Sequence, residues 1–217
     1  MGFLYNEYIL IIVLRYYNLK SYTNIYLSID SERRRYLLYS SVLSGVLYGL
    51  KAEIVRVEVD VGNGIPSFEM SGFLSNEVKE ARERVRVAIR NSGYELPPQR
   101  IVVNISPADI RKCGTGFDLP IALAILSANG YIDEVNVDNM IILGELSLDG
   151  SRVLPCVCEA KKSGISKALI PVSNYNEGRI VEKVNIIPTN SLKMAVQYIN
   201  NGIIENQRQD NPEQCRT

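Results

Sequence analysis

The sequence has no histidine and no tryptophan among its 217 residues, and it has only four cysteines. Without histidine, the chain cannot form a Ser-His-Asp or Cys-His catalytic group, and it lacks a common ligand of zinc sites. Cys156 and Cys158 form a lone C-x-C, which does not predict zinc binding without a second pair. The cysteines are also too few and too unevenly spaced for a disulfide-rich secreted protein. We therefore expect a cytoplasmic protein with free thiols and no metal site.

Long apolar runs and an excess of one charge are also missing. The strongest apolar run, Tyr8–Leu14, is about a third of the roughly 20 residues that a membrane helix needs. It follows Glu7 and lacks a basic leader, so we expect neither a membrane span nor a signal peptide. Lysine plus arginine and aspartate plus glutamate both number 24, so net charge gives no argument for nucleic-acid binding.

The composition changes twice along the chain. Residues 1–38 are rich in tyrosine, isoleucine and leucine, and we expect an N-terminal extension that is poorly ordered or packs as an extra helix. Residues 39–202 carry regular turn signals and enough apolar side chains for one core. Residues 203–217 are mostly polar and predict a tail or linker.

The middle segment mixes strands and helices. Ala52–Val61 alternates apolar with charged residues, the period of a half-buried strand, and the glycine turn after it predicts a hairpin that returns over Ser67–Gly72. A helix is expected from Asn76 to Ser92, with Ser75 as its cap. Further strands are expected at Arg100–Ile105, Met140–Leu146, Ala168–Pro171 and Val184–Ile187, and further helices from Asp118, at Pro155–Ser163 and at Ser191–Asn200. The fold class is therefore α+β, with helices packed on a mixed sheet.

Four basic residues recur at helical spacing along one flank of the helix expected from Asn76. They are Lys79, Arg82, Arg86 and Arg90. Such a stripe could follow a DNA backbone or contact a neighbouring subunit. However, Glu77, Glu80 and Glu83 alternate with it in sequence and can pair with Lys79, Arg84 and Arg86 about one turn away. We favour a solvated, ion-paired face, with the DNA contact as the alternative.

A loop with Gly114 and Gly116 precedes the helix expected from Asp118. Glycines before a helix bind phosphate in many proteins. Here Leu119 stands where G-x-G-x-x-G needs its third glycine, and Asp118 places a negative charge at the start of the helix. We therefore expect Asp118 to be a helix N-cap that accepts backbone hydrogen bonds, and we expect no cofactor in this loop.

Four segments follow one another at a characteristic spacing. They are YSSVLSGVLYGLKAEIVRVEVDVGNGIPSFEMSGF from Tyr39, NEVKEARERVRVAIRNSGYELPPQRIVVNISPADIRKCGTGFDLPIALAIL from Asn76, LGELSLDG from Leu143 and LIPVSN from Leu169. Together they resemble the N-terminal domain of the ComM/YifB family of AAA+ ATPases related to magnesium chelatase. The resemblance spans about residues 39–202. It implies the fold of ribosomal protein S5 domain 2, which the proteolytic domain of Lon protease shares.

The resemblance also bears on peptidase activity. Lon-type proteases place a nucleophilic serine in the loop before this helix, and Asp118 stands at the serine position. A carboxylate cannot supply the hydroxyl of a Ser-Lys dyad, and Lys161 and Lys162 come too late for the partner lysine. Family members also carry a few more residues between Asp149 and Pro155, which leaves the sheet geometry around residues 151–156 in doubt. We expect no peptidase activity.

Family members continue into an AAA+ module, and their best understood role is DNA branch migration during natural transformation. This chain has no G-x-x-x-x-G-K-[ST] phosphate loop. We expect an accessory or assembly domain that is not an enzyme, with ATP and magnesium needed only by the missing module. The expected partners are ATPase modules or subunits of the same family, in a ring, and DNA. The alternatives are an autonomous nucleic-acid-binding module and a degenerate Lon-type peptidase.

Overall fold

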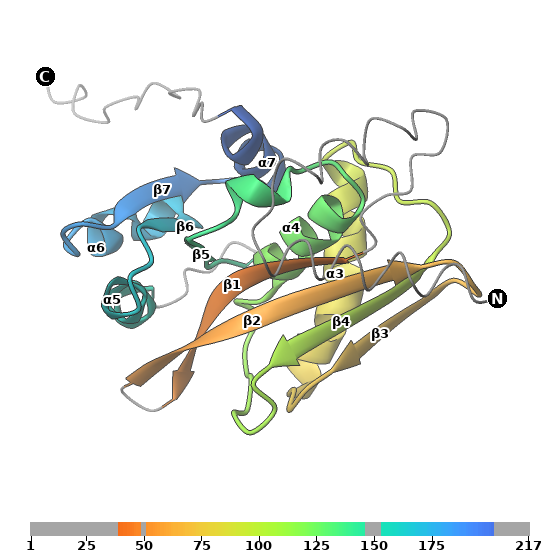
Figure 1. Ribbon diagram of the computed structural model, residues 1–217, viewed down its shortest axis with the longest axis horizontal. Coiled ribbons are helices and arrows are strands. Elements are labelled where there is room, and N and C mark those ends of the chain that lie inside the picture. The colour runs from red at the N-terminus through yellow and green to blue at the C-terminus, as the bar shows by residue number, and fades with distance from the viewer. Residues whose placement is uncertain (1–38, 49–50, 146–152, 202–217) are drawn as a thin grey trace, which may run out of the picture. The chain divides into compact units, whose positions relative to one another are not determined.

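The computed structural model describes residues 39–48, 51–145 and 153–201, which form a seven-stranded mixed sheet with helices packed on it (Figure 1). The strand order is β3-β4-β2-β1-β5-β6-β7. The strands are β1 (Tyr39–Tyr48), β2 (Lys51–Gly62), β3 (Ser67–Ser71), β4 (Arg100–Ser106), β5 (Met140–Ile142), β6 (Lys167–Pro171) and β7 (Asn185–Thr189). The helices are α3 (Asn76–Asn91), α4 (Asp118–Ala128), α5 (Leu154–Lys162), α6 (Tyr175–Gly178) and α7 (Leu192–Asn201). The α+β class is confirmed.

The expected extension, residues 1–38, and the expected tail, residues 203–217, lie outside the described residues. Most of the region from Asp149 to Pro155, where the chain departs from its family, lies outside them too. In the described ranges, no helix is both long enough and apolar enough to cross a membrane.

Strand β2 is the central strand of the first half of the sheet. Its alternating pattern is confirmed, because Val55, Val57, Val59 and Val61 are all buried. It pairs antiparallel with β1 on one side and with β4 on the other. Between the buried valines, its charged residues point to the opposite face of the sheet.

The hairpin expected between β2 and Ser67–Gly72 is wrong. Strand β3 pairs with β4 in parallel, with Phe68 opposite Ile101, and the hairpin partner of β2 is β1. The helix α3 lies between β3 and β4 in sequence, so these elements form a β-α-β unit. The long β1 and β4 ladders occupy both edges of β2, which leaves β3 no place beside β2.

Helices cover the two faces of the sheet unequally. Buried residues of α3, α4 and α7 join the inward valines of β2 in one hydrophobic cluster. A second cluster contains Val157 and Ala160 of α5 with Ile141, Ala168 and Ile170 of β5 and β6. Alternate residues of these strands, Ile142 and Leu169, belong to the first cluster. The β5-β6 region is therefore covered on both faces.

The helices predicted from Asn76, at Pro155–Ser163 and at Ser191–Asn200 are confirmed. α3 runs from Asn76 to Asn91 and buries Val78, Ala81, Val85 and Ile89, as the spacing indicates. Its N-cap is Ser75, but the Ser75 hydroxyl donates to Glu77 Oε2 at 3.0 Å and makes no capping bond. Helices α5 and α7 begin within one residue of their expected positions.

Strand β5 is shorter than expected and ends at Ile142. Gly144 has φ of +154°, outside the range that other residues adopt readily. The Leu143 N–H still donates to the Leu169 carbonyl at 2.9 Å. The chain therefore leaves the sheet at Gly144, and this carries it past the start of α4.

Candidate functional site

The start of helix α4 carries a buried ion pair. Asp118 is fully buried and accepts two hydrogen bonds from Arg84 of α3, at 2.6 Å from Nε and 3.0 Å from Nη2. Arg84 Nη2 also donates to the Glu77 carbonyl at 3.0 Å. The Asp118 carboxylate raises the pKa of the Arg84 guanidinium through this hydrogen bond. The pair links the two helices that cover the first cluster.

The expected role of Asp118 needs correction. The N-cap of α4 is Phe117, and Asp118 is the first helical residue. Its carboxylate neutralises Arg84, although the charge pattern of the sequence predicted pairing between Arg84 and a glutamate of its own helix. At about 100° per residue, Arg84 lies roughly opposite Arg86 and Arg90 around the helix. That rotation was the available signal that Arg84 faces a different neighbour.

The first N–H groups of α4, where a phosphate site needs free donors, already have protein acceptors. The N–H of Asp118 donates to the Thr115 carbonyl at 3.1 Å, and the N–H of Leu119 donates to the Gly144 carbonyl at 3.2 Å. Gly114 has φ of +83°, and its N–H lies 3.4 Å from Glu77 Oε2. Protein oxygens therefore occupy the first two donors of α4, where a phosphate would bind.

Lys112 is a buried residue that the sequence analysis missed. Its side chain is fully buried, and Nζ donates a hydrogen bond to the Pro107 carbonyl. Burial lowers the pKa of the Lys112 ammonium. Its backbone pairs with the segment between β3 and α3. The Lys112 N–H donates to the Phe73 carbonyl, and the Lys112 carbonyl accepts from the Ser75 N–H. Lysine is almost never fully buried, so nothing in the sequence indicated this position.

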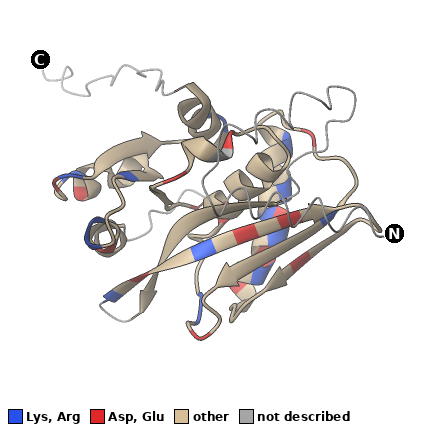
Figure 2. Ribbon diagram, viewed as in Figure 1, with Lys and Arg blue, Asp and Glu red and all other residues tan. Residues whose placement is uncertain are grey.

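The basic residues of α3 lie together on one flank. Lys79, Arg82, Arg86 and Arg90 are all exposed. Arg86 Cζ lies 5.4 Å from the ring centroid of Phe68 in β3, and Arg84 on the other flank contacts α4. Figure 2 shows positive and negative residues along α3 behind the sheet. We name the side with Lys79, Arg82, Arg86 and Arg90 the basic flank.

The ion pairs expected about one turn apart do not form in the described part of the chain. The exposed pair on this helix joins neighbours, Arg82 Nε and Glu83 Oε1, at 3.2 Å. Arg84 forms its ion pair with Asp118, and the Glu77 carboxylate accepts a hydrogen bond from the Ser75 hydroxyl. Glu77 and Glu80 lie with Arg84 on the side of the helix opposite the basic flank, because of the helical rotation. Glu77 and Glu80 are therefore separated from the basic flank in space, whereas Glu83 lies on it and pairs with Arg82.

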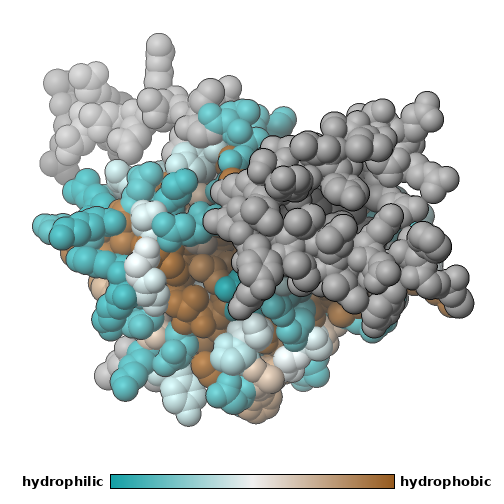
Figure 3. All heavy atoms as spheres, in the orientation of Figure 1, coloured by the Kyte–Doolittle hydropathy of each residue, from teal (hydrophilic) through white to brown (hydrophobic). Residues whose placement is uncertain are grey.

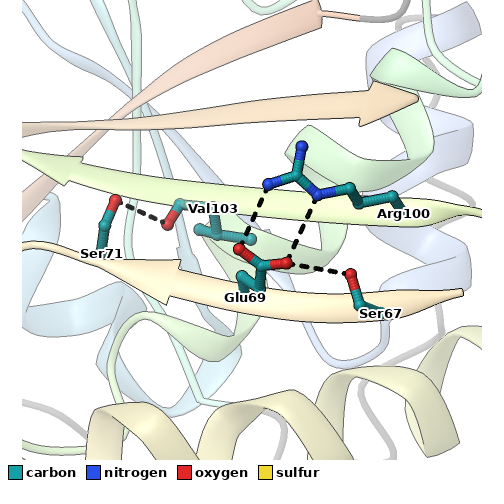
Figure 4. Close-up of polar contacts among 5 residues, drawn as sticks. All are labelled: Ser67, Glu69, Ser71, Arg100 and Val103. Carbon is teal, nitrogen blue, oxygen red and sulfur yellow. Dashed lines mark hydrogen bonds and ion pairs between the residues drawn. The ribbon is translucent and has the colours of Figure 1, made fainter. Parts of the chain in front are cut away.

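The sheet face opposite α3 carries polar cross-strand contacts (Figure 4). Arg100 of β4 donates from Nε and Nη2 to the Glu69 carboxylate of β3, both at 3.3 Å, and Ser67 Oγ donates to Glu69 at 3.1 Å. The hydrogen bond from Arg100 lowers the pKa of the Glu69 carboxyl. These groups are exposed, so they contribute little to stability and form no reaction site.

A shallow groove of about 220 Å³ lies on the same face near the end of β4. It is lined by Leu43, Ile54, Val55, Arg56, Ser106 and Pro107. Figure 3 shows apolar surface open over this region of the sheet. The described residues contain no cluster of acidic or cysteine side chains that could hold a metal ion.

The structure separates the predicted site residues into two groups. One group is the loop and helix start where Arg84 binds Asp118, with Gly114, Gly116 and Asp118. The other is the basic flank, which lies on the opposite side of α3 from Arg84. Neither group brings a nucleophile next to a base. The arrangement supports packing and electrostatic contact.

Comparisons with known proteins identify relatives over most of the described region. A family model for subunit ChlI of Mg-chelatase matches residues 57–174. Competence protein ComM of Haemophilus influenzae is 37% identical over 164 residues, which are 73% of this chain and 32% of ComM. A protein called YifB from Salmonella typhimurium is 45% identical over 156 residues, which are 70% of this chain and 31% of YifB. The chain thus spans about a third of the length of these curated relatives.

Proposed function

Because this chain belongs to the ComM/YifB family of proteins related to the ChlI subunit of Mg-chelatase, we propose that it is a non-catalytic accessory domain. In this role it assembles with an ATPase module of the same family, as a ring of subunits. The buried Arg84–Asp118 pair carries the proposal. By the resemblance to Lon-type domains, Asp118 stands at the nucleophile position, and this pair neutralises its carboxylate.

Two further contacts support the absence of peptidase chemistry. The buried amine, Lys112 Nζ, donates to the Pro107 carbonyl, and the first N–H groups of α4 donate to Thr115 and Gly144. A Ser-Lys dyad needs a hydroxyl beside such an amine, and an oxyanion hole needs free N–H groups. The site is thus built as a closed junction between α3, α4 and the end of β5.

The finer fold assignment is part of the same proposal. We assign the ribosomal protein S5 domain 2 arrangement, which Lon-type domains share. A mixed sheet with α3 and α4 on one face is compatible with it. The phosphate loop and its ATP and magnesium would then belong to the partner module, and the complex would process DNA in the cytoplasm, in keeping with the name of the competence protein among the relatives.

A second candidate function is nucleic-acid binding by this chain alone. The basic flank favours it, since its four cations are exposed and lie on one side of α3. Four cations with glutamates nearby hold duplex DNA weakly, but a ring of subunits multiplies weak contacts. We therefore place any DNA contact in the assembled ring.

The experiment uses the purified 217-residue chain and a family ATPase module from the same source organism. We expect a complex by light scattering after size-exclusion chromatography, and ATP hydrolysis only when the module is present. The chain alone should release no phosphate from ATP and cleave no unfolded casein. Casein cleavage by the chain that is lost in Lys112→Met would contradict the non-catalytic role. Failure to bind the module would contradict the assembly role.

A further inference from the structure

Strand β3 is the edge strand of the first half of the sheet. It pairs with β4 on one side, and no described strand lies on its other side (Figure 1). Natural edges are protected by proline, by charged side chains such as lysine, by a β-bulge or by being very short. The five-residue β3, SFEMS, has no proline or lysine, and its register with β4 is continuous from Ser67 to Ser71. Its one charged residue, Glu69, is paired with Arg100. The opposite edge strand, β7, contains Pro188.

The basic flank of α3 runs beside this edge. The contact of Arg86 with Phe68 places the flank next to β3, while Arg84 and Asp118 place the opposite side of α3 against α4. From Lys79 to Arg90 the helix rises about 16 Å, and five strand residues extend roughly 17 Å. The flank therefore meets β3 at Phe68, and its four cations span about the same length as the strand.

The two faces of the edge differ in charge. Phe68 is buried on the α3 side of β3, and Met70 packs against the same cluster. Glu69 lies on the other face, where Arg100 already neutralises it. A strand added at β3 would point alternate side chains toward the cations and toward this neutral face.

We propose that the β3 edge and the basic flank form a docking site for an extended acidic segment of a protein, which adds to the sheet as an eighth strand. The outer edge of β3, which pairs with no described strand, supplies hydrogen bonds, and the flank selects acidic side chains at alternate positions. Duplex DNA fits less well, because it has no peptide backbone to pair with β3. The proposal is independent of the proposed accessory function.

The probe is a synthetic peptide of about eight residues that alternates glutamate with valine, the period of a strand. We expect saturable binding to the full chain and protection of the backbone amides of Ser67–Ser71 from hydrogen exchange. A peptide of the same sequence with N-methyl groups at alternate positions keeps its charge but loses backbone donors. It should not bind. Equal binding by the N-methylated peptide would overturn the proposal.

Charge-reversed variants test the flank. Arg82→Glu, Arg86→Glu and Arg90→Glu together should lower the peptide affinity about tenfold or more. The matched control is Lys161→Glu, Arg179→Glu and Lys193→Glu, which changes the same charge at exposed positions on α5, beyond α6 and on α7. The control should bind as the unmodified chain does. An equal loss in both variants, or duplex DNA that binds more tightly than the peptide and displaces it, would overturn the proposal.

Discussion

The two halves of the sheet are joined to their helices in different ways. β3, β4 and the part of β2 that pairs with β4 have helices on one face and polar side chains on the other, and α3 meets α4 through the buried Arg84–Asp118 pair. β5 and β6 are covered on both faces, and their buried neighbours on α5 are Cys156, Val157 and Ala160. In the first half, a buried ion pair joins α3 to α4 in addition to the apolar cluster. In the second half, close apolar packing joins the elements.

This difference explains where the sequence was easy to interpret. A strand with one open face alternates apolar and polar residues, so β2 and β4 were predicted from their period. A strand covered on both faces reads as a short apolar run, as in β5 and β6. The run predicted a strand at β5 but gave no signal that it ends at Ile142.

The largest expected effect tests the polar junction of the first half. Arg84→Met leaves the fully buried Asp118 carboxylate without its cation, and it should lower the free energy of unfolding by about 3–5 kcal/mol. Asp118→Asn should lower the free energy of unfolding by less, because the Arg84 side chain that loses its partner is 30% exposed and stays hydrated. Urea unfolding of each variant measures the difference.

The control for this test is Arg82→Met, which removes an exposed pair and should cost about 0.5 kcal/mol or less. The double variant Arg84→Met with Asp118→Leu should recover much of the lost stability, because no unpaired charge remains buried. If Arg84→Met and Arg82→Met cost the same, the ion pair does not hold α3 to α4.

The apolar half can be tested through the thiol of Cys156. Burial raises its pKa to about 11 from the usual 9.0. The unfolded chain therefore ionises first, so the contribution of this thiol is complete below pH 9 and is lost as the pH rises toward 11. The loss at pH 10 is about 1.4 kcal/mol relative to Cys156→Ala. Urea unfolding of both proteins in reductant at pH 8 and pH 10 measures it, and equal slopes with pH would show that the thiol is accessible to water.

Close packing in the same region is tested by Gly45→Ala. A Cβ at Gly45 would lie 2.8 Å from Cys156 Sγ, closer than real contacts allow. Such overpacking costs about 1–3 kcal/mol. The matched control is Gly62→Ala at the end of the same hairpin, where an added Cβ meets nothing within 4 Å. Thermal unfolding should separate the two variants, and a Gly45→Ala protein as stable as the control would show that α5 moves away without cost.

The fold was more predictable than the site, for a physical reason. Local patterns predict α3, α7 and the buried face of β2, because each depends on neighbours in sequence. The partner of β3 and the partner of Asp118 depend on residues far along the chain. The glycine turn after β2 predicted a hairpin, yet β1 and β4 compete for β2 and displace β3. Lys112 has an ordinary polar sequence around it, so its burial could not be predicted.

The smallest expected effect concerns the outer surface of the first half, where the basic flank is solvated and makes few pairs. Replacing Arg82, Arg86 and Arg90 with alanine should change the free energy of unfolding by about 0.5 kcal/mol or less per residue, since the flank contributes little to the core. The chain should bind duplex DNA weakly or not at all near physiological salt, before and after the substitutions. Fluorescence anisotropy over a range of salt concentrations tests this. If the chain instead binds tightly, each phosphate contact contributes about 0.9 to the salt slope, and the triple variant should flatten it. Micromolar or tighter binding that the triple variant abolishes would show that the flank holds DNA without a ring.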